Sequence, residues 1–151
     1  MKLHVRLLEQ AEIPTAMALV QSVFMEFDAA SFAPSGVDAF LHYIQPERIC
    51  RDIAIGKLWV SGCFCRQELA GVAALQAPNH ISLLFVKREF HRQGVGSALF
   101  QQLKSSCERW RYLTVNASSY AVPIYQRWHF TPDAPPQEQD GVRFTPMTYR
   151  W

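Results

Sequence analysis

The chain has 151 residues, a length that suits one domain with one hydrophobic core. Apolar residues make up 49% of it and charged residues 19%, a composition that excludes an intrinsically disordered protein and a coiled coil. The formal net charge is +2 and no Lys/Arg run is present, so we expect no nucleic-acid partner. The sequence therefore predicts a single domain over residues 1–151.

The N-terminus and the cysteines indicate the compartment. Residues 1–6 are too polar for a signal peptide, and no apolar stretch approaches the roughly 18 residues of a membrane helix. The four cysteines form neither a CxxC pair nor a zinc spacing with histidine. We therefore expect a cytoplasmic protein with no membrane contact and no metal. Cys63 and Cys65, two apart in a strand-like run, should share a face and pack in the core.

The first third of the chain predicts one short strand and three helices. Val5–Leu8 has the pattern of an opening strand, and apolar residues recur at helical spacing over Ile13–Phe27. Residues 33–36, Ala-Pro-Ser-Gly, break this pattern. Two shorter helical segments follow, over Val37–Ile44 and Glu47–Ile55.

Strand patterns dominate the middle of the chain. Leu58–Cys65 and Leu69–Leu75 flank a hairpin turn at residues 66–68. A third strand is expected over His80–Val86. Apolar residues at four-residue steps from Val95 to Cys107 then predict a helix that begins on glycines.

The last third alternates strand and helix. We expect a strand over Leu113–Val115, a helix over Ala121–Trp128 capped by one of the serines before it, and a last strand over Val142–Tyr149. The segment Pro132–Gly141 is expected to be loop. The order of elements predicts an α/β fold with a mixed sheet, in which hairpins come first and the glycine-led helix forms a crossover.

The strand that leads into Gly94 and Gly96 predicts a phosphate-binding turn. The N–H groups in the first turn of a helix lack partners, the helix dipole adds partial positive charge, and Arg92 adds a formal one. The P-loop pattern G-x-x-x-x-G-K-[ST] is absent. The dinucleotide pattern G-x-G-x-x-G starts at Gly94 but fails at Leu99.

A second motif lies downstream, where Asn116-Ala117-Ser118 precedes Ala121 and Tyr125, and Phe130 ends the run. This segment and residues 91–96, His-Arg-Gln-Gly-Val-Gly, resemble the two signatures of the GCN5-related N-acetyltransferases (GNAT), A-x-x-x-Y-x-x-x-G-F and [QR]-x-x-G-x-[GA]. Two positions depart from them: His91 replaces Gln or Arg, and His129 replaces Gly. A glycine at the second position usually serves the end of the helix, so we expect His129 to cost some stability.

The resemblance implies a GNAT-type fold, with a central, mostly antiparallel sheet that splays at the strand before the glycine loop. It implies that acetyl-CoA is the co-substrate and that an amine attacks it directly in a ternary complex. Tyr125 would then give a proton to the departing CoA thiolate. The residues implied to contact the co-substrate are Leu84, Phe85, Val86, His91, Arg92, Gln93, Gly94, Val95, Gly96, Ser97, Asn116 and Ser118.

The acceptor amine must lose a proton, and the sequence leaves the base open. His80 is one candidate because its ordinary pKa is near neutral, and an unremarkable turn histidine is the alternative. Glu26 and Asp28, at the end of the first helix, are a further hypothesis as groups that hold a cationic substrate; the alternative is that both are solvated.

The partner expected from the resemblance is a small-molecule or peptide amine, and a homodimer is compatible with the family. Two other functions stay open at this point. One is an acetyl-CoA-binding sensor or regulatory module that catalyses nothing, and the other is an unrelated nucleotide-binding protein.

Overall fold

The computed structural model describes residues 2–151, which form eight strands, five α-helices and short 3-10 turns. The strands are β1 (Leu3–Leu7), β2 (Leu58–Cys65), β3 (Glu68–Gln76), β4 (His80–Val86), β5 (Tyr112–Ala117), β6 (Thr131–Pro132), β7 (Gln137–Gln139) and β8 (Val142–Arg150). The helices are α1 (Ile13–Phe27), α2 (Pro34–Tyr43), α3 (Pro46–Ala54), α4 (Val95–Ser106) and α5 (Val122–Arg127).

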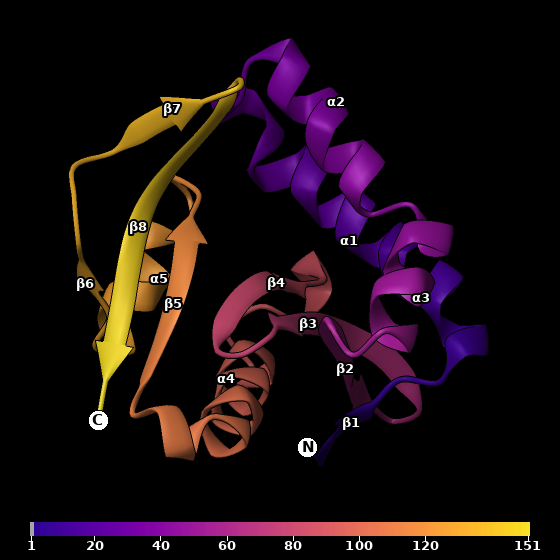
Figure 1. The fold of residues 1–151 in the computed structure, drawn as a ribbon. Coiled ribbons are helices and arrows are strands. Elements are labelled where there is room, and N and C mark those ends of the chain that lie inside the picture. The colour runs from indigo at the N-terminus through magenta and orange to yellow at the C-terminus, as the bar shows by residue number, and fades with distance from the viewer. Residues whose placement is uncertain (1) are drawn as a thin grey trace.

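The sheet consists of two parts that meet along a short seam (Figure 1). Strands run in the order β1-β2-β3-β4-β5-β8-β6, and β7 also pairs with β8. Every pairing is antiparallel except that of β4 with β5, the crossover pair joined through α4. These two strands pair only at His80 with Thr114 and Ile81 with Val115, and then diverge. The mostly antiparallel, splayed sheet expected from the sequence is thus confirmed.

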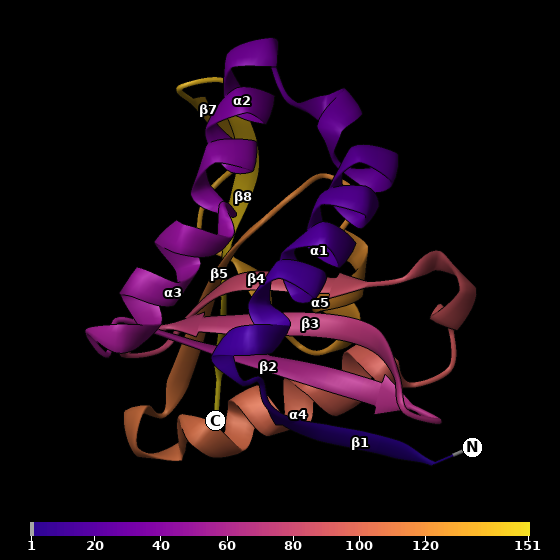
Figure 2. The same ribbon diagram turned by 90° about the vertical axis from the view of Figure 1, so that its right-hand side faces the viewer.

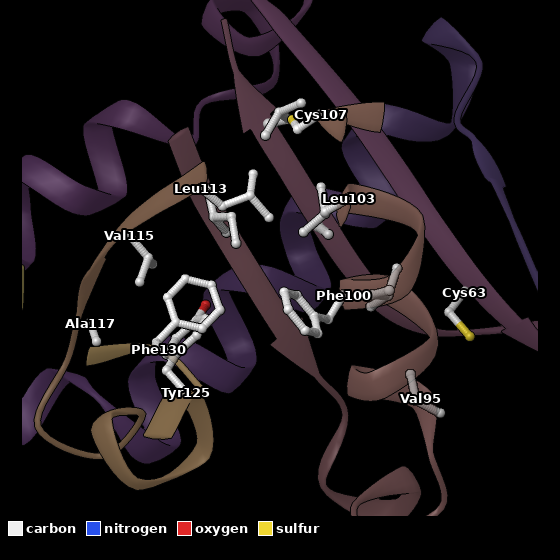
Figure 3. Close-up of a cluster of buried hydrophobic side chains, with 14 of the residues drawn as sticks. Cys63, Val95, Phe100, Leu103, Cys107, Leu113, Val115, Ala117, Tyr125 and Phe130 are labelled. Carbon is white, nitrogen blue, oxygen red and sulfur yellow. The ribbon is translucent and has the colours of Figure 1, made fainter. Parts of the chain in front are cut away.

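Helices cover both faces of the first part of the sheet (Figure 2). Helices α1 and α3 pack on one face, over β2, β3 and β4, and α4 packs on the other. Below the gap between the two parts, the side chains of α4 meet those of β5 and of the segment after α5. Phe100 and Phe130, for example, have ring centroids 5.5 Å apart (Figure 3). One core therefore joins the two parts of the sheet while leaving its upper edge open.

Two features start the divergence of β4 from β5. Asn79, buried just before β4, donates from its side-chain amide to the carbonyl of Tyr112 at 3.0 Å, and its own carbonyl accepts from Thr114 N–H. The register between β3 and β4 then shifts at Ser82, the residue of β4 without a counterpart on β3. Such a bulge bends a strand and turns its backbone groups. Asn79 fixes the closed end of the gap, and Ser82 begins the open end.

The helix and strand boundaries agree with the sequence in most places. The bounds of α1, β2 and β4 match their predicted ranges, and Cys63 and Cys65 are both buried in the core. Two predictions were wrong. The break between α1 and α2 lies at residues 28–33 and not at 33–36, because residues 34–36 form the first turn of α2, where proline loses no hydrogen bond. The segment predicted as loop, Pro132–Gly141, contains the end of β6 and all of β7.

The end of α5 gives a structural reason for the stability cost expected of His129. Its φ is +72°, its N–H bonds to the carbonyl of Gln126, and the N–H of Phe130 bonds to the carbonyl of Tyr125. These two bonds make a Schellman motif, in which the residue at the position of His129 adopts the left-handed conformation that glycine takes without penalty.

We expect His129→Gly to raise the free energy of unfolding by about 1 kcal/mol, because a side chain in this conformation costs roughly 1–2 kcal/mol. The His129 side chain is exposed, so little packing is lost. Urea denaturation measures the change. His129→Ala is the control, since alanine keeps the penalty. An equal gain in both variants would show that the imidazole, and not the backbone, is the source.

Candidate functional site

A cavity of about 1060 Å³ occupies the gap between β4 and β5. Its walls come from four places: the diverging half of β4, the turn before α4, the end of β5 with α5, and the aromatic ends of α1 and α2. The hairpin of β7 and β8 closes one side with Gln139, Asp140 and Phe144. The volume lies at the upper end of the range for ligand pockets, so the cavity can hold a large co-substrate and a second molecule together.

The turn before α4 presents unpaired backbone donors to this cavity. Gly94 has a φ of +85° and precedes the first residue of α4. The first N–H that bonds within the helix is that of Ala98, to the carbonyl of Gly94, so the three N–H groups before it have no helical partner. All three residues, Val95, Gly96 and Ser97, line the cavity. With Arg92 beside them, they form a site suited to a phosphate group.

Tyr125 also lines the cavity, with its ring packed against other aromatic rings (Figure 3). Its centroid is 5.6 Å from that of Trp128 and 5.1 Å from that of Phe130, both in edge-to-face geometry. Only 5% of Tyr125 is exposed. Burial, together with the negative charge of nearby Asp28, raises the pKa of the phenol. The group therefore stays protonated at neutral pH and can serve as a proton donor.

Asp28 joins the site from the end of α1. It is buried, lines the cavity, and accepts a hydrogen bond from the hydroxyl of Ser118 at 2.5 Å. Burial raises the pKa of this carboxyl, and the bond from Ser118 opposes that effect only in part. Glu26, the other acidic residue expected near a cationic substrate, lies outside the cavity and pairs with Arg88 on the surface at 2.7 Å.

His80 lies at the closed end of the gap. Its Nδ1 is 2.7 Å from the hydroxyl of Thr114, across the seam between β4 and β5. Burial lowers the pKa of the imidazole, which favours the neutral form at pH 7. The ring lines the cavity, so its role as a base stays a prediction.

His91 ties the glycine turn to two other walls of the cavity. Its Nε2 donates to the carbonyl of Val86 at 2.8 Å, and its ring lies 5.1 Å from that of Phe27 at the end of α1. Phe27 in turn stacks on Tyr120 at 4.9 Å. The residue that departs from the glycine-loop signature thus fastens the turn to β4 and α1.

The cavity brings together all the site residues expected from the sequence except Gln93 and Glu26. The side chain of Gln93 instead donates to the carbonyl of Glu89. Ser118, expected to contact the co-substrate, donates a hydrogen bond from its hydroxyl to Asp28 and accepts one from the N–H of Ala121. Among residues 2–151, no group of three His, Cys, Asp or Glu side chains could hold a metal ion, and no helix could cross a membrane.

Sequence reasoning missed two parts of the cavity. Trp128, predicted only as the end of a helix, lines the cavity and stacks on Phe100 at 4.9 Å. Tyr120 was not considered. The only sequence signal for Tyr120 is its position in the second motif, five residues before Tyr125.

Comparison with known proteins agrees with this geometry. Residues 28–151 match the family model described as an acetyltransferase (GNAT) domain. A relative, the uncharacterized N-acetyltransferase YafP of Escherichia coli (strain K12), is 32% identical over 100 residues, and the match covers 66% of this chain and 61% of that protein.

Solved structures show the same fold. A GCN5-related N-acetyltransferase from Rhodopseudomonas palustris has a TM-score of 0.84 at 17% identity, covering 100% of this chain and 97% of that one. The PaiA N-acetyltransferase from Thermoplasma acidophilum, solved in complex with coenzyme A, has a TM-score of 0.80 at 15% identity, with 100% of both chains covered. Fold, motifs and family match agree, and the chain belongs to the GNAT acetyltransferase family.

Proposed function

We propose that this protein is an acetyl-CoA-dependent N-acetyltransferase that acetylates a primary amine. The observation that carries the proposal is the position of Tyr125, a buried phenol in the same cavity as the unpaired N–H groups of α4. The transfer needs a proton donor for the leaving thiolate and a site for the phosphates of CoA, and groups suited to both line this cavity. The coenzyme A complex of the structurally similar PaiA supports the same co-substrate.

The residues present fit acetyl-CoA in three respects. The N–H groups of Val95, Gly96 and Ser97 suit a pyrophosphate. Beyond Ile81, the backbone of β4 has no partner on β5, so its edge toward β5 can pair with the amides of the pantetheine arm, although the carbonyl of Val86 already accepts from His91 Nε2. The cavity also has room for an acceptor next to the co-substrate.

Acetyl-CoA supplies the acetyl group as a thioester. The chain's own contribution at the leaving group is the phenol of Tyr125, which is protonated at neutral pH like any phenol and whose pKa burial raises further. A phenol at this position gives its proton to the sulfur as the carbon–sulfur bond breaks. On the amine side, His80 and Asp28 are the candidate proton acceptors, among cavity-lining groups that also include His91 and Asp140.

Ligand-induced stabilisation tests the co-substrate. We expect acetyl-CoA and CoA, at about 100 times their Kd, to add roughly 2.7 kcal/mol to the free energy of unfolding. ATP and NAD should add much less, because they lack the pantetheine arm that pairs with β4. Thermal denaturation with each ligand measures the difference. Equal stabilisation by ATP or NAD would favour an unrelated nucleotide-binding protein.

Release of CoA thiol in the presence of an amine library tests the transfer. We expect at least one primary amine to accelerate release well above the rate with acetyl-CoA alone. Tight binding of acetyl-CoA with no acceleration by any amine would contradict the enzyme and would support a sensor.

A further inference from the structure

Asp28 is the only charged side chain that is buried among residues 2–151, with 6% of it exposed. Its one side-chain hydrogen bond is the 2.5 Å bond from Ser118 to Oδ1. None of the ion pairs formed within the same residues includes Asp28. A buried carboxylate without a cation is unfavourable, and its place as the C-cap of α1 adds an unfavourable interaction with the helix dipole. The fold alone gives no reason for an acid here.

The surroundings of Asp28 indicate what would satisfy it. The carboxylate lies at the wall of the cavity, and Ser118, which donates to it, also accepts from the N–H of Ala121, one turn before Tyr125. A ligand group beside Asp28 is therefore also near the phenol of Tyr125, the group that we propose as the proton donor to the leaving sulfur. The charged or titratable side chains that line the same cavity are His80, His91, Arg92, Tyr120, Arg127, Asp140 and Arg143, besides Tyr43 and Tyr125.

The walls next to Asp28 are aromatic. Phe24 lies 5.2 Å from Phe32 and stacks on Phe40 at 4.1 Å, centroid to centroid, and all three line the cavity. The only other acid on the cavity wall is Asp140, exposed at the turn between β7 and β8. One buried carboxylate in an aromatic wall matches a ligand with one positive charge and an apolar body. A polyamine would leave further cations without buried partners.

We propose that Asp28, held by Ser118, binds the ammonium group of a monocationic amine with an apolar body and accepts the proton that this amine loses. The inference rests on the proposed acetyltransferase function and names its acceptor class and its base.

The proposed reaction moves two protons off the amine nitrogen. One proton passes from the ammonium group to the Asp28 carboxylate, and the freed lone pair forms the carbon–nitrogen bond with the acetyl carbonyl carbon. The carbon–sulfur bond breaks, and Tyr125 protonates the sulfur. The nitrogen then loses a second proton, which restores the phenol, and Asp28 releases its proton to water. The products are the acetamide, CoA thiol and one proton.

His80 is less suited to this step than Asp28. Its Nδ1 is engaged with Thr114 at the closed end of the gap, where β4 and β5 still pair. Asp28 has a free carboxylate oxygen and lies near Tyr125.

Steady-state kinetics of Asp28→Asn, with acetyl-CoA and 2-phenylethylamine as substrates, tests the proposal. We expect kcat/KM for the amine to fall by about 10²-fold. The Kd of acetyl-CoA, measured by calorimetry, should stay within about twofold, because Asp28 supplies none of the N–H groups of the phosphate cradle. The melting temperature should not fall, since asparagine keeps the bond from Ser118 and removes a buried charge.

Four further measurements complete the test. Glu26→Gln is the matched control: it removes the same charge from the same helix, on the surface, and should leave turnover unchanged. Ser118→Ala should raise the KM for the amine, because it releases the carboxylate. His80→Gln should lose less activity than Asp28→Asn. The wild type should prefer 2-phenylethylamine to spermidine.

Full activity of Asp28→Asn, loss of its fold, or a larger loss in His80→Gln would overturn the role of Asp28. A preference for spermidine would overturn the acceptor class. If the wild type acetylates no amine at all, the proposed function itself is wrong, and the failure is then visible before any variant is compared.

Discussion

Replacing Tyr125 with phenylalanine should lower kcat by roughly 10²–10⁴-fold, the range that a positioned general acid contributes. The reason is the loss of one proton donor at the sulfur, with the ring itself unchanged. Phenylalanine keeps the edge-to-face contacts with Trp128 and Phe130, so the free energy of unfolding should change by no more than about 1 kcal/mol. Single-turnover kinetics with saturating acetyl-CoA measures the chemical step.

Tyr120→Phe is the matched control for this experiment. Tyr120 lines the same cavity, but 43% of it is exposed, and it stacks on Phe27 through its ring. Removing its hydroxyl should leave the chemical step almost unchanged. If Tyr125→Phe retains wild-type kcat, or if the two variants lose equally, the phenol of Tyr125 is not the acid.

Replacing Gly36 with alanine should destabilise the protein by about 2–3 kcal/mol, as overpacking does at rigid contacts. In most helices this substitution is stabilising, because alanine is the better helix former. Here a Cβ on Gly36 would lie 2.1 Å from the carbonyl oxygen of Gly141, in the hairpin of β7 and β8. Neither group is a flexible side chain, so α2 and the hairpin must move apart.

The separation should also affect the acceptor side of the cavity, which the hairpin closes with Asp140 and Phe144. We expect the KM for the amine to rise, and the Kd of acetyl-CoA to stay unchanged, because the phosphate cradle lies on α4. Urea denaturation measures the change in the free energy of unfolding. Steady-state kinetics gives the KM for the amine, and calorimetry gives the Kd of acetyl-CoA. Asp38→Ala, at an exposed position of α2, is the control and should be close to neutral. A stabilised Gly36→Ala variant would show that α2 and the hairpin can separate at this contact with little loss of free energy.

The sequence predicted the elements whose patterns are local. Helix α1 has apolar residues at regular spacing, and β2 and β4 are apolar runs bounded by turn residues, so their limits could be read directly. Strand β7 could not be predicted in this way. All three of its residues are polar and exposed, and it is a strand only because it pairs with β8.

In the candidate site too, the residues in contiguous motifs were predicted, and those that depend on distant parts of the chain were not. The glycine turn and Tyr125 were predicted because each lies in a contiguous motif. Asp28 looked like one of two acids at the end of a helix, and nothing nearby in the sequence separates it from Glu26. Its burial depends on Ser118, 90 residues later in the chain. The bulge at Ser82 likewise depends on the register with β3.

The most direct test of the proposed activity is transfer of a labelled acetyl group. The wild-type protein is incubated with acetyl-CoA labelled in the acetyl carbon and with a panel of primary amines, and the products are analysed by mass spectrometry. We predict a labelled acetamide of at least one amine, formed with one equivalent of CoA thiol and strongly reduced in Tyr125→Phe. Binding of acetyl-CoA without any labelled acetamide, or equal product from Tyr125→Phe, would contradict the account.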